Sequence, residues 1–365
     1  MLEKYAKLLC NYCIEAKKNQ RILIKTTDLA IPLVKEIYKE LLTIGCFVET
    51  DISFEDQDRL FYDFACDTQL KSPSKFYEKA IEEFDGLIRI IAPHNLKSTA
   101  SVNSDKKKLH QEALAPLKKR YMERSATKDL KWVLCVYPTQ SAAQEAGMSL
   151  SEYEEFVYRG CMLDQEDPIS AWNRLSTSQQ TLVDRLNKAH KIRYVGDKTD
   201  ISFSTKNRIW INSDGHYNMP SGEVFTGPVE DSVNGTVFFS YPTVYEGADV
   251  ENVYLEVENG IVKKWHAEIG QDVLDRVFSI KGAQQFGEVA IGTNYAIQRA
   301  TKNILFDEKI GGSIHMAIGA SYPETGGTNE SAVHWDMIKD MKKGGKIYVD
   351  DELIYENGKF LYYFE

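Results

Sequence analysis

Two residues near the end of the chain, His334 and Asp336, have types and a spacing that suit metal binding. They stand two positions apart, with Trp335 between them, in the stretch NESAVHWDMI. Along a β-strand side chains alternate between faces, so both would point to one side, whereas on a helix they would diverge by about 200°. An imidazole beside a carboxylate is a ligand pair for zinc and related ions, which predicts metal-assisted chemistry if further ligands lie nearby.

Two glutamates occupy positions that suit a metal ligand. Glu223, in NMPSGEVFTGP, follows Pro220 and Gly222, which predict a turn, and begins a strand-like run. A ligand at such a rigid position is held in place before the ion arrives, although an exposed glutamate at a turn is the alternative. Glu288 follows Gly287 and precedes the apolar run VAIG. A carboxylate at the entrance to a core is costly unless it is paired or bound to a cation.

The segment GGSIHMAIGASYP places a histidine in apolar surroundings. His315 lies between flanking glycines, and Tyr322 follows seven residues later, just before Pro323. A buried imidazole needs a partner, which is either a hydrogen bond within the core or a metal ion. The other histidines are expected at the surface or in satisfied polar positions: His94, His110, His190, His216 and His266.

Taken together, these segments offer three carboxylates and two imidazoles, all within the last 150 residues. This ligand set favours zinc, cobalt or manganese over calcium or magnesium. Three acidic groups can bridge two ions about 3.5–4 Å apart, so the sequence is compatible with a dinuclear site. The H-E-x-x-H motif is absent, which argues against a helix-based protease with a single zinc ion.

The elements that must position these residues fall into two kinds. In the first half, apolar runs alternate with segments of helical periodicity. Strands are expected at 21–26, 46–53, 86–92 and 131–138. Helices are expected at 2–18, 28–45, 74–84 and 101–127. This βαβα order predicts a largely parallel sheet with right-handed crossovers, and no G-x-G-x-x-G follows the first strand to indicate dinucleotide binding.

The second half has a different pattern. Residues 149–190 are expected to be mostly helical, and from about residue 192 short strand-like runs alternate with Gly, Asn and Asp turns. Asn259-Gly260 between two such runs predicts a β-hairpin. The fold class is therefore α/β: an N-terminal α/β domain over 1–195, packed on a C-terminal β-rich α+β domain over 196–365 that carries the metal site.

Composition limits the classes of function. The chain has 365 residues, 43% of them apolar, which suffices for two domains with buried cores. A net charge of −10 argues against non-specific binding to nucleic acids or anionic membranes. No apolar run approaches the length of a membrane span, and the N-terminus lacks the features of a signal peptide. We therefore expect a cytoplasmic protein with reduced thiols, in which Cys10 and Cys13 are ordinary cysteines rather than a redox or zinc motif.

Four stretches give the second half a resemblance to a known family. NMPSGEVFTGP, FGEVAIGTN, GGSIHMAIGASYP and HWDMI, in this order, resemble the metalloaminopeptidases of peptidase family M29, and 113–133 resembles the corresponding first-half segment. The resemblance implies two divalent metal ions, peptide substrates with a free N-terminus, a metal-activated water and a homodimer. Carried over residue by residue, it implies these metal ligands: Glu223, Glu288, His315, Tyr322, His334 and Asp336.

Roles within this set follow from the resemblance and from the chemistry of the side chains. Glu288 is expected to bridge both ions and to take part in catalysis. Tyr322 is expected either to bind metal or to stabilise the oxyanion. Only eleven residues separate Tyr322 from His334, which is compact and could alter substrate access or the dimer. Two alternatives stay open: another dimetal amidase or esterase, and a catalytically silent metal-binding protein.

Overall fold

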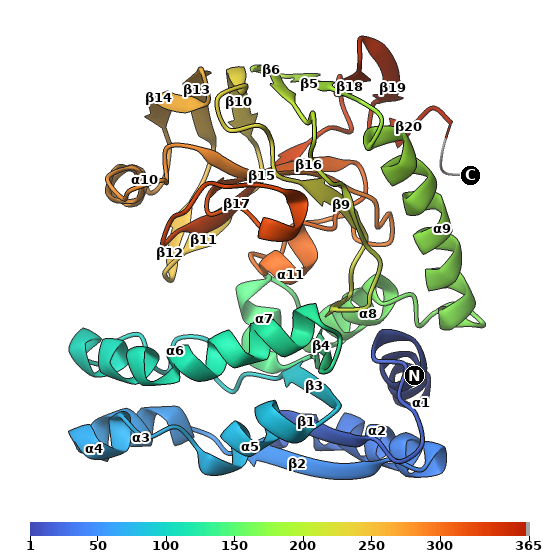
Figure 1. The fold of residues 1–365 in the computed structure, drawn as a ribbon, viewed down its shortest axis with the longest axis vertical. Coiled ribbons are helices and arrows are strands. Elements are labelled where there is room, and N and C mark those ends of the chain that lie inside the picture. Colours follow the sequence, from blue (N-terminus) through green and yellow to red (C-terminus); the bar gives the residue numbers. More distant parts are fainter. Residues whose placement is uncertain (363–365) are drawn as a thin grey trace. The chain divides into compact units, whose positions relative to one another are not determined.

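The computed structural model describes residues 1–362, and the chain packs as two compact units (Figure 1). Unit 1 comprises Met1–Ile169 and Gly215–Met219. Unit 2 comprises Ser170–Asp214 and the described residues from Pro220 onward. The domain boundary expected between residues 195 and 196 stays a prediction. In the structure, the helix that contains residues 170–186 packs with unit 2, because its buried side chains contact the later strands.

Unit 1 is built around a parallel sheet, as the alternating sequence pattern predicts. All strand pairs in it are parallel, and the order is β2-β1-β3-β4-β8. The strands are β1 (Arg21–Thr27), β2 (Phe47–Ser53), β3 (Gly86–Ile91), β4 (Lys131–Val136) and β8 (Asn218–Met219). The first four coincide with the predicted strands to within two residues at each end.

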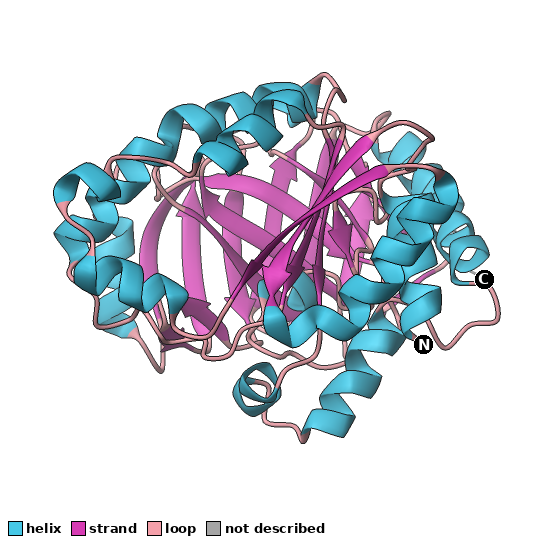
Figure 2. Cartoon of the chain, turned by 90° about the horizontal axis from the view of Figure 1, so that it is seen from below, coloured by secondary structure: helices cyan, strands magenta, loops and turns pink. Residues whose placement is uncertain are grey.

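The helices of unit 1 alternate with these strands along the chain, and Figure 2 draws all helices in cyan and all strands in magenta. They are α1 (Leu2–Lys7), η1 (Leu8–Cys13), η2 (Asp28–Ala30), α2 (Ile31–Ile44), α3 (Gln57–Phe64), α4 (Asp67–Leu70), α5 (Lys75–Glu83), α6 (Ser104–Ala126), α7 (Gln140–Glu145) and α8 (Leu150–Gly160). Local signals fix several ends. Gly45 ends α2 in a left-handed conformation, and the Asn103 side chain accepts hydrogen bonds from the first backbone amides of α6.

Unit 2 is β-rich and contains an eight-stranded antiparallel sheet of order β14-β13-β10-β6-β5-β18-β19-β20. Its strands are β5 (Lys191–Gly196), β6 (Thr199–Ser204), β10 (Asn234–Phe239), β13 (Val253–Glu258), β14 (Ile261–His266), β18 (Lys346–Val349), β19 (Glu352–Glu356) and β20 (Lys359–Phe360). Asn259 and Gly260 join β13 to β14, both with positive φ (49° and 77°), as a type I′ turn requires. The predicted hairpin is thus confirmed.

A second, five-stranded antiparallel sheet of unit 2 has the order β17-β16-β15-β9-β7. Its strands are β7 (Ile211–Ser213), β9 (Glu223–Thr226), β15 (Phe286–Gly292), β16 (Ser313–Gly319) and β17 (His334–Asp340). Side chains from both sheets, such as Phe203 and Val237 from one and Val289 and Met316 from the other, belong to a single apolar core. That shared core fixes which face of the five-stranded sheet remains for polar residues.

The remaining elements of unit 2 lie around these sheets. They are α9 (Pro168–Leu186, from residue 170), α10 (Gln271–Phe278), α11 (Ile304–Asp307), η3 (Pro323–Thr325) and the strand pair β11 (Thr243–Tyr245) and β12 (Ala248–Val250). Across residues 1–362, no helix combines the length and the apolar character that a membrane crossing requires.

Candidate metal centre

The five-stranded sheet of unit 2 has one apolar face and one polar face. Side chains that alternate along its strands enter the core: Val224, Val289, Ile291, Ile314, Met316, Ile318, Trp335 and Met337. The side chains between them therefore point to the opposite face. This opposite face carries Glu223, Glu288, His315, His334 and Asp336. It brings together five candidate ligands that the sequence places in four separate segments.

The register of the strands aligns these ligands across the sheet. Ala317 of β16 pairs with Glu288 of β15 on one side and with Asp336 of β17 on the other. The two carboxylates thus flank an alanine, whose methyl group leaves space above the sheet. His334 and Asp336 are the first and third residues of β17, so they lie in the extended segment that their spacing predicts. His315 lies one pleat along β16 from Ala317, on the same face.

Gly287 shapes the strand that carries Glu288. The register between β15 and β16 shifts between Phe286 and Glu288, which is the signature of a β-bulge. A Cβ atom on Gly287 would lie 2.2 Å from the carbonyl oxygen of Ala320, so no larger residue fits without movement. The Gly-Glu step in the sequence therefore marks a close approach of two backbones beside a buried carboxylate.

Glu223 is held at the start of β9 by its surroundings. Gly222 adopts a φ of 114°, and a Cβ atom there would meet the side chain of Asn294 at 2.6 Å. Gln179, on α9, donates a hydrogen bond to the Glu223 carbonyl oxygen at 3.2 Å and accepts one from the Thr293 hydroxyl at 2.7 Å. Sequence reasoning missed Gln179, because nothing local indicates which side of α9 faces the sheet.

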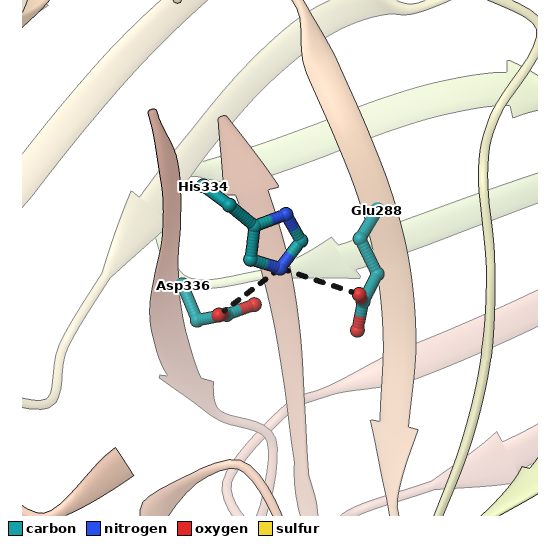
Figure 3. A group of neighbouring side chains, drawn as sticks. All are labelled: Glu288, His334 and Asp336. Carbon is teal, nitrogen blue, oxygen red and sulfur yellow. Dashed lines mark ion pairs between the residues drawn. The ribbon is translucent and has the colours of Figure 1, made fainter. Parts of the chain in front are cut away.

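The ligand atoms converge around Glu288. One of its oxygens, Oε1, lies 3.2 Å from His315 Nε2, and the other, Oε2, lies 3.5 Å from His334 Nε2. His315 Nε2 also lies 3.4 Å from Glu223 Oε2, and His334 Nε2 lies 3.5 Å from Asp336 Oδ2. One ligand atom each from Glu288, His334 and Asp336 falls within 4.8 Å of the others (Figure 3). Glu288 thus sits between a Glu223–His315 side and a His334–Asp336 side.

His334 is oriented by a backbone contact. Its Nδ1 lies 2.8 Å from the carbonyl oxygen of Ala320, which can only accept, so Nδ1 carries the proton. Nε2 then faces Glu288 and Asp336 and is the ring nitrogen available to a cation. A hydrogen bond from the second ring nitrogen is the usual way in which proteins orient a metal-binding histidine.

Several buried polar atoms in this cluster lack hydrogen-bond partners among the described residues. Glu223 Oε2 and Asp336 Oδ1 are acceptors of this kind, and both belong to the cluster. A buried carboxylate oxygen without a partner is unfavourable, since burial removes its hydration. The chemistry of this donor set, with carboxylate oxygens and imidazole nitrogens facing one another, fits divalent cations.

Tyr322 lies at the edge of the cluster. It follows β16 at the N-terminus of η3, and its ring centroid is 4.9 Å from that of His334 and 5.7 Å from that of Phe225. Burial, together with the charges of Glu288 and Asp336, raises the pKa of its hydroxyl well above the usual value. The side chain is 39% exposed, so this ring is the most accessible of the six predicted site residues.

A buried lysine and its neighbour complete the polar face, and sequence reasoning missed both. Lys309 Nζ lies 2.7 Å from Glu223 Oε1 and 2.5 Å from Glu308 Oε2. The Lys309 side chain is 1% exposed. The available signal was three charged residues, Asp307 to Lys309, set in an otherwise apolar segment directly before the strand that carries His315.

Crowding of acidic groups shifts their protonation. Burial and the nearby charge of Glu223 raise the pKa of Glu288 to about 8, and burial and the charge of Glu288 raise the pKa of Asp336 to about 6. Burial also acts to raise the pKa of Glu223, but the Lys309 ammonium outweighs it, and this pKa is lowered. Burial raises the pKa of Glu308 to about 8, although Lys309 opposes the shift. Without cations, the cluster therefore retains protons at neutral pH.

Comparisons with known proteins all lead to one family. Residues 1–360 match the family described as thermophilic metalloprotease (M29). The chain is 26% identical to aminopeptidase AmpS of Bacillus subtilis, over 99% of this chain and 98% of that one. It is 27% identical to aminopeptidase 2 of Geobacillus stearothermophilus, over 92% and 91%, and 26% identical to aminopeptidase T of Thermus thermophilus, over 98% and 95%.

A solved structure has the same fold. The wild-type AmpT structure from Thermus thermophilus superimposes with a TM-score of 0.84 and covers 99% of this chain and 98% of its own. Sequence identity over this superposition is 23%, so the likeness speaks for the fold alone.

Proposed function

The chain belongs to the thermophilic metalloprotease family M29, and from this premise we propose that it is an aminopeptidase that removes N-terminal residues from peptides with divalent metal ions. The observation that carries the proposal is the position of Glu288 between two imidazoles, with one oxygen towards each. A single carboxylate placed in this way suits a bridging ligand between two cations.

The proposed ligands divide into two groups around Glu288. Glu223 and His315 would hold one ion, and His334 and Asp336 the other, in line with the contacts within each pair. When bound, two such ions polarise the scissile carbonyl and lower the pKa of a water molecule towards neutrality. Zinc, cobalt and manganese fit this mixed oxygen and nitrogen set, and we propose two ions from among them.

Other residues would act on the substrate directly. The Tyr322 hydroxyl, at the accessible edge of the site, is proposed to donate a hydrogen bond to the developing oxyanion or to bind metal. Its raised pKa keeps it protonated near neutral pH, as a donor must be. Glu288, which prefers to carry a proton in the absence of cations, is proposed to share in proton handling during peptide cleavage.

A homodimer and a cytoplasmic location remain parts of the proposal.

Metal affinity should fall as the pH falls, because protons compete for the same oxygens. With the pKa of Glu288 at about 8, an incoming ion must displace a proton below that pH. Affinity should therefore drop by roughly tenfold per pH unit from pH 8 to 6, and more steeply below 6, where Asp336 also takes up a proton. Calorimetric titration with Mn²⁺ in two buffers of different ionisation enthalpy should show at least about one proton released at pH 7, from Glu288 and from the metal-bound water.

The same titration at pH 9 is the control for that measurement. Glu288 is then already ionised, so its share of the proton release should disappear, and any release that remains reports the metal-bound water. Binding at pH 7 without proton release would mean that Glu288 keeps its proton when the metal binds. Glu288 would then not be a metal ligand.

Cleavage should require a free N-terminus, which is the test of the proposed activity. An aminopeptidase must recognise the free terminal amine and therefore counts from the end of the chain, so an N-acetylated peptide should be cut far more slowly than its free counterpart. Product analysis by mass spectrometry should show residues released one at a time from that end. Equal rates on both peptides would favour an endopeptidase or another amidase, and no turnover of any aminoacyl or ester substrate would favour a silent metal-binding protein.

A further inference from the structure

Lys309 is a full positive charge inside a site that must itself bind cations. Its ammonium contacts Glu223 Oε1 at 2.7 Å and Glu308 Oε2 at 2.5 Å, and the side chain is almost entirely shielded from solvent. A buried ammonium is costly to desolvate and would repel a nearby divalent ion. An apolar side chain would pack better at this position. The presence of a lysine against a proposed metal ligand therefore needs a reason other than packing.

The contact with Glu223 limits what this carboxylate can offer. Lys309 occupies Oε1, whereas Oε2 faces His315 Nε2 at 3.4 Å and has no hydrogen-bond partner among the described residues. One oxygen is thus held by the protein and one is left for a cation. A carboxylate anchored in this way cannot rotate to bind one ion through both oxygens without breaking its ion pair.

Lys309 also changes the charge that surrounds the ions. The carboxylates that meet here are Glu223, Glu288, Glu308 and Asp336, four negative charges when all are ionised. With the ammonium included, three remain. If two divalent ions and one hydroxide were bound, they would carry three positive charges together, and the loaded site would then be neutral with the lysine included.

We propose that Lys309 is a positioning residue of the metal site: it fixes Glu223 with a single free oxygen and serves as a permanent counter-charge to the carboxylates when the ions are absent. This inference rests on the proposed function. It predicts that the lysine stabilises the metal-free protein more than the metal-bound protein. It also predicts that its positive charge weakens the binding of the ions.

Lys309→Met tests this inference by thermal melting of chelator-treated protein before and after addition of Zn²⁺. Loss of the ammonium leaves the carboxylates without their counter-charge, so the melting temperature should fall mainly in the metal-free state. Removal of a neighbouring positive charge should tighten zinc binding at least about tenfold, measured by competition with a chromophoric chelator. The rise in melting temperature on zinc addition should then widen by roughly 2–4 °C relative to wild type.

Lys339→Met is the matched control. Lys339 is a buried lysine of the same sheet, on β17, but its Nζ donates to the backbone oxygen of Asp197 rather than to a site carboxylate. Its replacement should lower both melting temperatures equally and leave the zinc-induced rise unchanged. If Lys309→Met behaves like Lys339→Met, with equal losses and unchanged zinc affinity, Lys309 is only structural and the inference is wrong.

Glu308→Gln gives an independent arm if Lys309→Met does not fold in either state. Glutamine keeps the shape and an acceptor for Lys309 but cannot supply the negative charge that Glu308 offers to bound ions, so zinc affinity should weaken about tenfold or more and the zinc-induced rise should shrink. Unchanged affinity in this variant would overturn the inference. Absence of any zinc-induced rise in the wild-type protein would instead contradict the proposed metal site itself, which separates the two failures.

Discussion

Glu288→Gln is expected to lower kcat/KM by about 10²–10⁴-fold while the protein remains folded. Glutamine keeps the shape of the side chain but removes the negative charge that lies between His315 and His334. Two cations on either side would then repel each other with less compensation, and at least one should bind more weakly. The reacting water would also lose a neighbouring base.

The measurement combines kinetics on a free dipeptide with metal content of the purified variant. Glu258→Gln is the control, because Glu258 is an exposed glutamate at the end of β13 in the same unit. Glu230, on the loop after β9, is a glutamate closer in sequence to the site but is unsuitable as a control. It accepts hydrogen bonds from Thr328 and pairs with Arg208. A Glu288→Gln variant that retains two ions and near-normal turnover would show that this carboxylate is structural. The ligand set would then have to be rebuilt around Glu223 and Asp336.

Complete removal of metal should abolish peptidase activity, and zinc, cobalt or manganese should restore it. Divalent ions would supply the Lewis acid that polarises a peptide carbonyl, and the buried carboxylates need cations to offset their charge. Dialysis against a strong chelator, with residual metal measured by mass spectrometry, should give activity that tracks bound metal. The melting temperature should fall in parallel, because ions that bind only the folded state stabilise it.

Readdition of each metal in turn provides the control for chelator damage. Recovery with at least one ion, at a stoichiometry near two per chain, is the expected result. Full activity in protein whose metal content is zero would contradict the metallopeptidase proposal for this chain. Full recovery of activity with one ion bound per chain would still support a metallopeptidase but would refute the dinuclear arrangement.

Some parts of the site could be predicted because they depend on neighbours in sequence. His334 and Asp336 share a face because strand geometry alternates with period two, whatever the strand pairs with. Gly287 and Gly222 indicated the glutamates that follow them. At Gly287 another backbone approaches closely, and Gly222 has a positive φ, so other residues fit poorly at both positions. The Asn259-Gly260 turn and the parallel sheet of unit 1 follow from equally local rules of turn type and element order.

Other parts were decided only by the tertiary structure. Whether Glu288 faces Asp336 depends on the register of β16 between them, and a slip of one residue would turn His315 into the apolar core. Nothing local in the sequence indicates that Lys309 is buried, and its burial against Glu223 depends on how the segment after α11 folds over the sheet. Helical periodicity alone does not reveal that Gln179 reaches the backbone of Glu223. The sequence thus specified which residues could bind a metal ion. Long-range packing decided their common face, their distances and the buried charge among them. The reason is that the energies that fix strand register and burial come from residues far away in the chain.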